Sequence, residues 1–525
     1  MLIAQIDVPQ NEDRGDFYYR TYAPGTAMAQ EVGIYVINLT YFHPKRDEII
    51  KEADVLILNN ICDPDLLPVI RSRKESRKLT VYELSDDLDA LPPWNPVYPF
   101  YQNPENSILL KTIARSCDAI QFSSQELSKK YGYLNSTCVV FPNHMLALPP
   151  ERRFARRKQA IIGWGGSFGH LEDIRSIAEP LIRWIVTKED VCLHLMCSDA
   201  IWNLFRDLPE DRKKRFETGS LLDYYQFLST IDIGIAPLLD CAYNRSRSDV
   251  KFLEYAAHSV VPVVQRATPY FSAVRHDQNG YFFENAKELI QILDNLAHDF
   301  STRIRVAICA RDYVVEERWS PKRIKESTSF YRTQLDRRMR VEQPQNGCQR
   351  VFESLASTEG AALKNRHLML LPTSFELMLR IGLTTSSPAE RAKASQAFKQ
   401  ASHLEPGNYL PHLLGAYHCG NPVDSFLKAL EKNPHSIKAW MLLGEEFSKN
   451  GNTNRALECF NSAARVYPKY GVPQLKAASL YKSQNRQDDS KANERNTLFQ
   501  PRQPGSFRRC KNLQREPSFP LRVLR

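Results

Sequence analysis

Short apolar runs alternate with amphipathic stretches along the first part of the chain. Apolar runs bounded by turn residues predict buried parallel strands, and the helical period between them predicts crossover helices. The expected strands are Leu2–Ile6, Gly33–Asn38, Asp54–Asn60, Leu79–Leu84, Ala119–Ser123 and Thr137–Phe141. Residues 1–150 are therefore predicted to form a parallel α/β lobe of Rossmann type.

A second lobe of the same kind is predicted for residues 151–335. It begins with a basic connector, ERRFARRKQ at 151–159, which comes directly after Pro149 and Pro150. Its first strand leads into the glycine-rich loop GWGGSFGH, and strands and helices then alternate to about residue 285, with further helices beyond. Two Rossmann-like lobes joined by a connector predict a bilobed protein with a cleft between them.

The remaining sequence has a different pattern. Residues 336–372 are weakly patterned and are predicted to be a linker with some helix. Residues 373–484 then carry an internal repeat, in which prolines, alanines and phenylalanines recur in register: Pro406, Pro434 and Pro468; Ala401, Ala429 and Ala463; Phe398, Phe426 and Phe460. The last two prolines are 34 residues apart, and this is the tetratricopeptide period.

This region resembles tetratricopeptide repeats with a shortened middle unit, and a generic helical bundle is the alternative. Solenoids of that kind bind peptides or other subunits along a concave face. The resemblance therefore implies an all-α module that recruits a protein partner.

Charge and composition narrow the setting of the protein. The net charge is +10, and residues 481–525 hold eleven Lys and Arg against four Asp and Glu. This proline-containing tail, 485–525, is expected to be disordered, and its charge would suit peripheral contact with an anionic membrane rather than specific nucleic-acid binding. The start of the chain lacks the features of a signal peptide, and eleven cysteines without a CxxC pair indicate a reduced, cytoplasmic protein.

The most informative segment is IDIGIAPLLDCAYNRSRSDVKFLEYAAHSVVPVV at 231–264, which predicts strand, loop, helix and strand. In such sheets ligands bind beyond the carboxyl ends of the strands, where this loop and helix start would lie. Lys251 and Glu254 are three residues apart and share one helix face. The carboxylate can accept hydrogen bonds from two hydroxyls and the ammonium can pair with phosphate, so the pair suits a sugar nucleotide. An ordinary surface Lys–Glu pair is the alternative.

The same segment resembles the donor-binding segment of glycosyltransferase family 4, whose members are retaining enzymes of the GT-B fold. The matching residues are Asn244, Ser248, Asp249, Lys251, Glu254, Tyr255, Ala256, Ala257, Pro262 and Val263. The resemblance implies a nucleotide-diphosphate sugar as co-substrate, no metal or other cofactor, and Glu254 on the ribose hydroxyls. Many members have a second glutamate beside the transferred sugar, and here that position is Ser246.

The glycine-rich loop supplies the other half of the expected site. Glycine lets backbone N–H groups approach phosphate, and a helix starts near Leu171, so Gly165, Gly166 and Ser167 are predicted to cradle the donor diphosphate. Arg245, Arg247 and Ser248 are predicted to complete the donor-binding set. Lys251 and His170 are the predicted catalytic residues, and Asp173 would accompany His170 at the helix start. A dinucleotide site is a weaker alternative, because the glycines depart from GxGxxG spacing.

The sequence thus predicts a cytoplasmic, metal-independent glycosyltransferase, or one peripheral at the inner face of the membrane. Its acceptor would be a glycan, a lipid-linked glycan or a protein. Two alternatives stay open: a non-catalytic scaffold, in which Ser246 marks lost chemistry, and a sugar-nucleotide epimerase.

Overall fold

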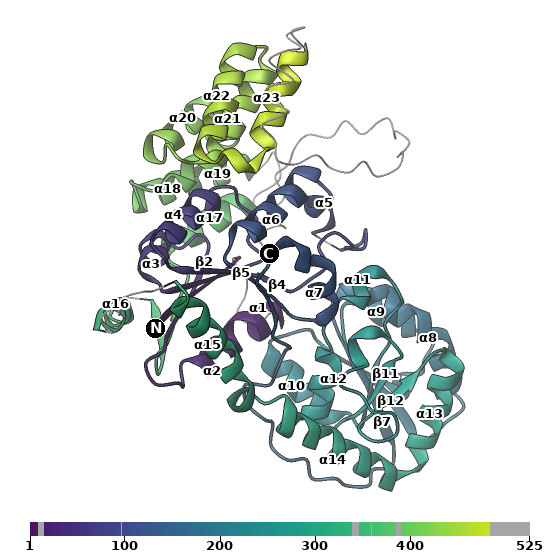
Figure 1. Cartoon of the computed structure of the whole chain (residues 1–525). Helices are drawn as coiled ribbons and strands as arrows, with labels where there is room; N and C mark the ends of the chain where they lie inside the picture. The colour runs from purple at the N-terminus through teal and green to yellow at the C-terminus, as the bar shows by residue number, and fades with distance from the viewer. Residues whose placement is uncertain (9–14, 96, 339–345, 359, 385–389, 484–525) are drawn as a thin grey trace.

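The computed structural model describes residues 1–8, 15–95, 97–338, 346–358, 360–384 and 390–483, and contains two β-sheets and a helical C-terminal region (Figure 1). The first sheet has the order β13-β14-β2-β1-β3-β4-β5-β6. Its strands are β1 (Leu2–Asp7), β2 (Tyr35–Thr40), β3 (Val55–Asn59), β4 (Leu79–Leu84), β5 (Ala119–Phe122), β6 (Cys138–Val140), β13 (Ala361–Lys364) and β14 (His367–Leu370). Strands β1 to β6 pair in parallel, as expected for apolar strands buried on both faces.

The helices of this lobe begin with α1 (Gly15–Phe17) and a π-helix at Tyr18–Tyr22, which lead directly into α2 (Ala23–Met28). The others are α3 (Arg46–Glu52), α4 (Leu66–Glu75), α5 (Tyr98–Tyr101), α6 (Pro104–Ser116) and α7 (Gln125–Tyr131). The short π-helix is a rare distortion, and such distortions often occur at functional segments.

The second sheet has the order β12-β11-β10-β7-β8-β9 and is parallel throughout. Its strands are β7 (Ala160–Gly165), β8 (Val191–Met196), β9 (Lys213–Phe216), β10 (Ile233–Ala236), β11 (Val261–Gln265) and β12 (Tyr281–Phe283). Its helices are α8 (Leu171–Ile185), α9 (Asp199–Trp202), α10 (Leu221–Thr230), α11 (Ala242–Arg245), α12 (Val250–Ala257), α13 (Ala286–His298) and α14 (Phe300–Glu317). The predicted pair of Rossmann-like lobes is therefore confirmed.

The boundary predicted at residue 335 needs a correction. Helix α15 (Ser320–Asp336) leaves the second lobe and packs on the first, where Tyr331 is buried and donates a hydrogen bond to Gln121 at 2.6 Å. Ile324 and Leu335 belong to the same apolar core as Val81. The hydrophobic period predicts a helix at this place but not the lobe on which it packs.

Residues 336–372 are also more than the predicted linker. They contain α16 (Asn346–Ala356) and the antiparallel hairpin β13–β14, and β14 pairs in parallel with β2. Leu368 is fully buried by this pairing. The hairpin covers the backbone groups along β2 that would otherwise form an open sheet edge, which is the physical reason for its place here.

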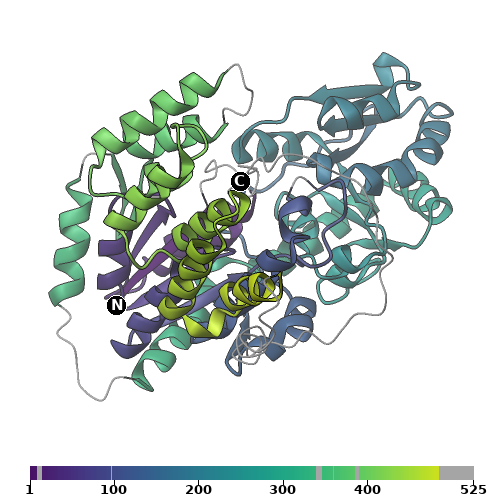
Figure 2. The same ribbon diagram turned by 90° about the horizontal axis from the view of Figure 1, so that it is seen from above.

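The C-terminal region consists of helices, as predicted, and lies on the N-terminal lobe (Figures 1 and 2). Its helices are α17 (Ser374–Thr384), α18 (Arg391–Leu404), α19 (Leu410–Leu414), α20 (Pro422–Lys432), α21 (Ile437–Lys449), α22 (Thr453–Val466) and α23 (Val472–Ser483). The in-register phenylalanines and alanines of the repeat are all buried. Their tetratricopeptide character stays a prediction, and the basic tail at 485–525 lies outside the described residues.

Polar contacts attach this helical region to the first lobe. Asp65, just before α4, accepts hydrogen bonds from the hydroxyls of Tyr409 at 3.0 Å and Ser436 at 2.8 Å. Lys438 forms an ion pair with Asp63 at 3.2 Å. Asp65 is buried, so these contacts satisfy a carboxylate that would be costly to leave alone. In the part of the chain described here, no helix combines the length and apolar character needed to cross a bilayer.

Replacing Gly444 with alanine is expected to destabilise the α21–α22 pair by about 1–3 kcal/mol, although alanine normally favours a helix. An added Cβ would lie 2.7 Å from the Phe460 ring, so the two helices would have to separate. Urea unfolding measures the change. Gly407→Ala is the matched control, because nothing lies within 4 Å of its Cβ position. Equal stability of the two variants would show that the close approach is not required.

Candidate functional site

The predicted site residues gather at the carboxyl ends of β7 and β10, which are neighbours in the second sheet. Asp173, at the start of α8, connects the loop that follows β7 with the loop that follows β10. Its Oδ1 atom accepts hydrogen bonds from the Leu239 backbone N–H at 2.9 Å and from the Asn244 side chain at 3.0 Å. The loop after β7 and the loop after β10 therefore form one polar surface, as expected for ligand binding in a parallel α/β sheet.

Glu254 lies buried on α12 and is surrounded by tyrosine hydroxyls. Tyr19 donates a hydrogen bond to Oε1 at 3.0 Å, and Tyr224 donates one to Oε2 at 3.1 Å. Tyr19 belongs to the π-helix of the other lobe, so this contact joins the two lobes. The two tyrosines take one acceptor position on each carboxylate oxygen, so any other hydroxyl that bonds Glu254 shares its oxygens with them.

Lys251 completes this cluster from the same helix face. Its Nζ donates to the Tyr224 hydroxyl at 2.9 Å and lies 3.5 Å from Glu254 Oε2. Burial lowers the pKa of Lys251, and the neighbouring Glu254 carboxylate opposes that shift. The predicted pairing of Lys251 and Glu254 on one helix face is thus present, in a partly buried position rather than on an open surface.

His170 is held by Asp173, with its Nδ1 2.8 Å from Asp173 Oδ2. Burial and the positive charge of Arg247 lower the pKa of His170 to about 4, and the hydrogen bond that His170 donates to Asp173 opposes this shift. The ring is therefore neutral at pH 7. A neutral ring that donates from Nδ1 to a carboxylate keeps Nε2 as a hydrogen-bond acceptor, which suits a sugar hydroxyl.

Arg247 is the most available cation of the site. Among the residues that the structure describes, its guanidinium makes no hydrogen bond or ion pair, and it lies over the Tyr243 ring at 5.4 Å. Burial opposes its charge, but Tyr243, Asp86 and Asp173 raise the pKa of Arg247 above its ordinary value. A half-buried guanidinium in this position is suited to an anionic ligand.

Arg245 and Ser248, which were predicted to bind the donor, contact other residues than Arg247 does. Arg245 is exposed and forms a two-point ion pair with Asp240, at 2.6 and 2.7 Å. Ser248 accepts a hydrogen bond from Asn143 of the first lobe at 3.1 Å. Spacing alone cannot distinguish Arg245 from Arg247, because the loop turns between them.

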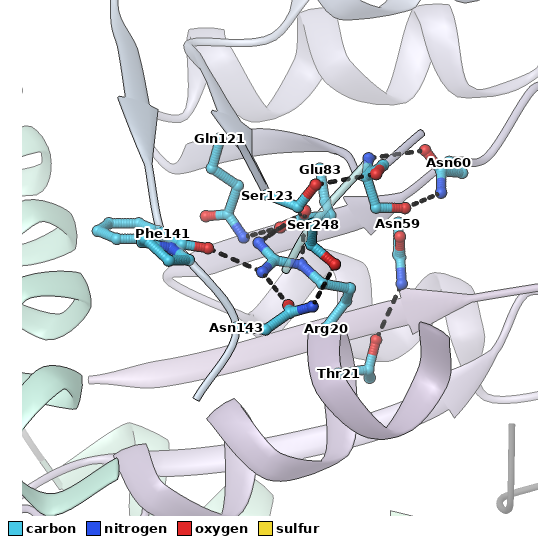
Figure 3. Close-up of polar contacts among 12 residues, drawn as sticks. Arg20, Thr21, Asn59, Asn60, Glu83, Gln121, Ser123, Phe141, Asn143 and Ser248 are labelled. Atoms are coloured by element: carbon cyan, nitrogen blue, oxygen red, sulfur yellow. Dashed lines mark hydrogen bonds and ion pairs between the residues drawn. The ribbon is translucent and has the colours of Figure 1, made fainter. Parts of the chain in front are cut away.

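The Asn143 contact is part of a network that joins the two lobes (Figure 3). Arg20 donates to Asn143 at 2.8 Å and forms a buried ion pair with Glu83 at 2.9 Å. On the other side, Arg318 bonds the Asn143 carbonyl at 2.8 Å and pairs with Asp249 at 2.6 Å. Asp249 precedes α12, so the network positions the helix that carries Lys251 and Glu254.

Ser246 is buried and faces the other lobe. Its hydroxyl lies 3.4 Å from Asp87 Oδ2, and its carbonyl accepts from Ser124 at 2.7 Å. Asp87 is itself paired with Lys130 at 2.6 Å. The neighbouring Asp86 is only half-buried, and burial together with Asp16 raises its pKa to about 6. Asp86 is thus the carboxyl group of the first lobe that faces Arg247.

The glycine-rich loop has a packing role that the sequence does not predict. A Cβ on Gly165 would lie 2.7 Å from the Tyr224 ring, so glycine allows Tyr224 to reach Glu254. The Gly166 N–H bonds the Met196 carbonyl at 3.1 Å, and Ser167 is exposed at the start of a short 3-10 helix, Phe168–His170. Within the described residues, no group of three or more His, Cys, Asp or Glu side chains could hold a metal ion.

The sequence did not predict two residues of the site, Tyr19 and Tyr224, which donate hydrogen bonds to Glu254. The tyrosine-rich run DFYYRTY at 16–22 is a signal of an unusual loop. Nothing local indicates that Tyr19 reaches Glu254, 235 residues further along the chain.

Sequence and structure comparisons give the following similarities. No protein-family model and no curated protein matches the chain. Among solved structures, HepE (Alr3699) of Anabaena in complex with UDP matches at 12% identity and a TM-score of 0.47, over 63% of this chain and 100% of that one. Sucrose-phosphate synthase of Thermosynechococcus elongatus matches at 13% and 0.43, over 63% and 98%. A Rickettsia africae glycosyltransferase matches at 13% and 0.44, over 64% and 98%. The function of this chain therefore rests on its own residues.

The free energy of unfolding of the protein is expected to depend on pH through the protonation of His170. A folded-state pKa of about 4, below the ordinary 6.5, gives a stabilising contribution above pH 6.5 that is lost as the pH falls towards 4. Relative to His170→Gln, the wild type should lose about 2 kcal/mol of unfolding free energy between about pH 7 and pH 5. Urea unfolding of both proteins at the two pH values measures this difference, and parallel pH profiles would contradict it.

Proposed function

We propose that this protein is a glycosyltransferase of the GT-B type that uses a nucleotide-diphosphate sugar. The observation that carries the proposal is the half-buried Arg247 guanidinium, which has no ionic partner within the described residues and lies with Lys251 and His170 at the carboxyl ends of the strands. Arg247 and Lys251 bind the diphosphate, and the N-terminus of α8 adds its dipole. Glu254 accepts the ribose hydroxyls, and His170 accepts a hydroxyl of the sugar.

The proposed reaction proceeds with retention and without a metal ion. The bond between the sugar anomeric carbon and the diphosphate oxygen breaks, and the acceptor oxygen forms its bond on the same face. The acceptor proton passes to the leaving diphosphate. Arg247, Lys251 and the backbone N–H groups near Ser167 stabilise the charge that develops on that diphosphate, which is where preorganised donors act most strongly.

The acceptor is a glycan, a lipid-linked glycan or a protein. The helical region, as a tetratricopeptide-like module, would recruit a protein partner to the N-terminal lobe on which it lies. We place the protein in the cytoplasm, or peripherally at the inner face of the membrane.

Calorimetric binding of UDP, GDP, ADP and dTDP tests the proposal directly. We expect selective binding of one nucleotide, weakened about tenfold or more in Glu254→Gln and in Lys251→Ala, because a charged hydrogen-bond partner is lost in each. Glu179→Gln is the control, since Glu179 is a well-exposed residue of α8. Failure of the folded wild type to bind any of the four would overturn the donor site.

Tyr19→Phe is expected to strengthen nucleotide binding by about threefold to tenfold, because ribose would no longer share Oε1 of Glu254 with the Tyr19 hydroxyl. The 3.0 Å hydrogen bond from Tyr19 occupies Oε1 of that carboxylate. The same titrations measure the effect. Weaker binding in Tyr19→Phe would instead make the hydroxyl part of the nucleotide site.

A non-catalytic scaffold is the second candidate, and one observation favours it. Ser246 replaces the usual glutamate and is engaged with Asp87, while Glu254 is enclosed by tyrosines. Release of free sugar from a nucleotide sugar, or its transfer, separates the two candidates. Nucleotide binding without either activity would favour the scaffold.

A further inference from the structure

A small hollow lies at the opposite end of the strands of the second sheet from the candidate active site. It is bordered by Asp232 and Ser259, which precede β10 and β11 at their amino ends, and by the first turns of α14. The connector between the lobes forms its other wall. We call it the connector pocket. Its basic lining consists of Arg152, Arg153, Arg157 and Arg303.

The connector pocket has more positive charge than its own residues can balance. Asp232 is its single lining carboxylate, and it is already paired with Arg152 at 2.8 Å and with the Ile161 N–H at 3.0 Å. Arg157 and Arg303 donate only to backbone carbonyls: Arg157 to Thr230 at 2.9 Å, and Arg303 to Leu296 and, at 2.7 Å, to Ala297. Within the described residues, Arg153 makes no hydrogen bond or ion pair. Carbonyl groups satisfy N–H donors but carry no net charge that would balance a guanidinium.

The pKa values of two of these arginines are lowered by burial and by the neighbouring positive charges. Burial lowers the pKa of Arg152, and Arg157 and Arg303 lower it further against the effect of Asp232. Burial also lowers the pKa of Arg303; Asp232 and Asp299 oppose that shift, and Arg156 of the connector adds to it. Like charges held together in a partly buried place are unfavourable unless an anion joins them.

The pocket also has an apolar side. Phe154, Phe300 and Ile304 line it beside the arginines, and the Arg303 guanidinium lies over the Phe300 ring at 5.4 Å. Guanidinium groups bind phosphate oxygens in a two-point geometry, and the apolar wall can accept the body of a molecule that carries the phosphate.

We propose that the connector pocket binds the phosphate group of a phosphorylated ligand, at a site separate from the donor site. Arg153 and Arg157 would bind the phosphate from the connector and Arg303 from α14. The phosphate belongs either to a free phosphorylated molecule or to the head group of an anionic lipid, and the chemistry recognised is the same. This inference does not depend on the proposed function, because it uses no residue of the candidate active site.

Pyrophosphate titrated calorimetrically into the full chain tests the proposal. We expect binding in a background of Arg247→Ala with Lys251→Ala, which disables the donor site. Adding Arg153→Ala and Arg157→Ala should weaken that binding about tenfold or more, because two charge-assisted contacts are lost. With Arg247 and Lys251 left intact, the same connector substitutions should remove one pyrophosphate site, whether or not the donor site also binds pyrophosphate. This provides a readout if the double-substituted background folds poorly. The control is Arg183→Ala with Arg206→Ala, which removes equal charge from side chains that are 77% and 81% exposed.

Sedimentation with vesicles distinguishes the two sources of phosphate. Vesicles of phosphatidylcholine are compared with vesicles that also contain phosphatidic acid. Binding to the acidic vesicles that is lost in Arg153→Ala with Arg157→Ala assigns a lipid head group. Pyrophosphate binding lost in that variant, without vesicle binding, assigns a free phosphorylated molecule. If neither probe binds, or if the control lowers binding equally, the connector pocket is not a phosphate site.

Discussion

Replacing Arg247 with alanine is expected to slow sugar transfer by about a hundredfold or more, the usual effect of removing one preorganised donor to a developing negative charge. The Arg247 guanidinium lies at the carboxyl ends of β7 and β10 beside His170, and among the described residues it has no ionic partner of its own. Because the substitution breaks no hydrogen bond or ion pair of the Arg247 side chain within the described residues, the free energy of unfolding should change by less than about 1 kcal/mol. Steady-state kinetics with the nucleotide sugar selected by calorimetry measure the loss.

Arg245→Ala is the matched control, two residues away in the same loop. Its side chain is 55% exposed and paired with Asp240, so kcat/KM should stay within about twofold of wild type. An equal loss in both variants would mean that the loop as a whole, and not the Arg247 charge, supports the reaction. An unchanged rate in Arg247→Ala would remove this residue from the diphosphate site.

Replacing Arg20 with alanine is expected to lower the free energy of unfolding by about 3–5 kcal/mol, because it leaves a buried carboxylate without its partner. Glu83 is fully buried, and Arg20 pairs with it through Nε at 2.9 Å and Nη2 at 3.1 Å. Arg20 also bonds the Phe141 carbonyl at 2.8 Å, so its loss also breaks the connection to the last strand of the lobe. Urea unfolding at constant pH measures the change.

The pH dependence gives this prediction a second test. Burial raises the pKa of Glu83 in the wild type, and Arg20 opposes that rise. Without Arg20 the folded-state pKa should rise further, so the variant should be most destabilised at high pH and should recover as the pH falls and Glu83 binds a proton. Adding Glu83→Gln should restore part of the stability. Arg323→Ala, at an exposed ion pair, should cost less than about 1 kcal/mol. A cost equal to this control would contradict the prediction.

The sequence predicts much of what lies close together along the chain. The apolar run before Pro237 and the helical spacing of Lys251 and Glu254 are properties of a few consecutive residues. The structure places that run in β10 and that pair on one face of α12. Hydrophobic period and turn residues act locally, through backbone geometry and the burial of one face. The two lobes and the helical region follow from the same local rules.

Only the tertiary structure decided how distant segments combine. Tyr19 reaches Glu254 across 235 residues, the hairpin β13–β14 completes the sheet edge at β2, and α15 returns to the first lobe. It also decided that Arg247 faces the site while Arg245 faces solvent. Polar side chains carry no hydrophobic period, and sheet edges can pair with any strand of suitable length. Which partner each one meets therefore depends on packing of the whole chain, while the elements themselves depend on their own residues.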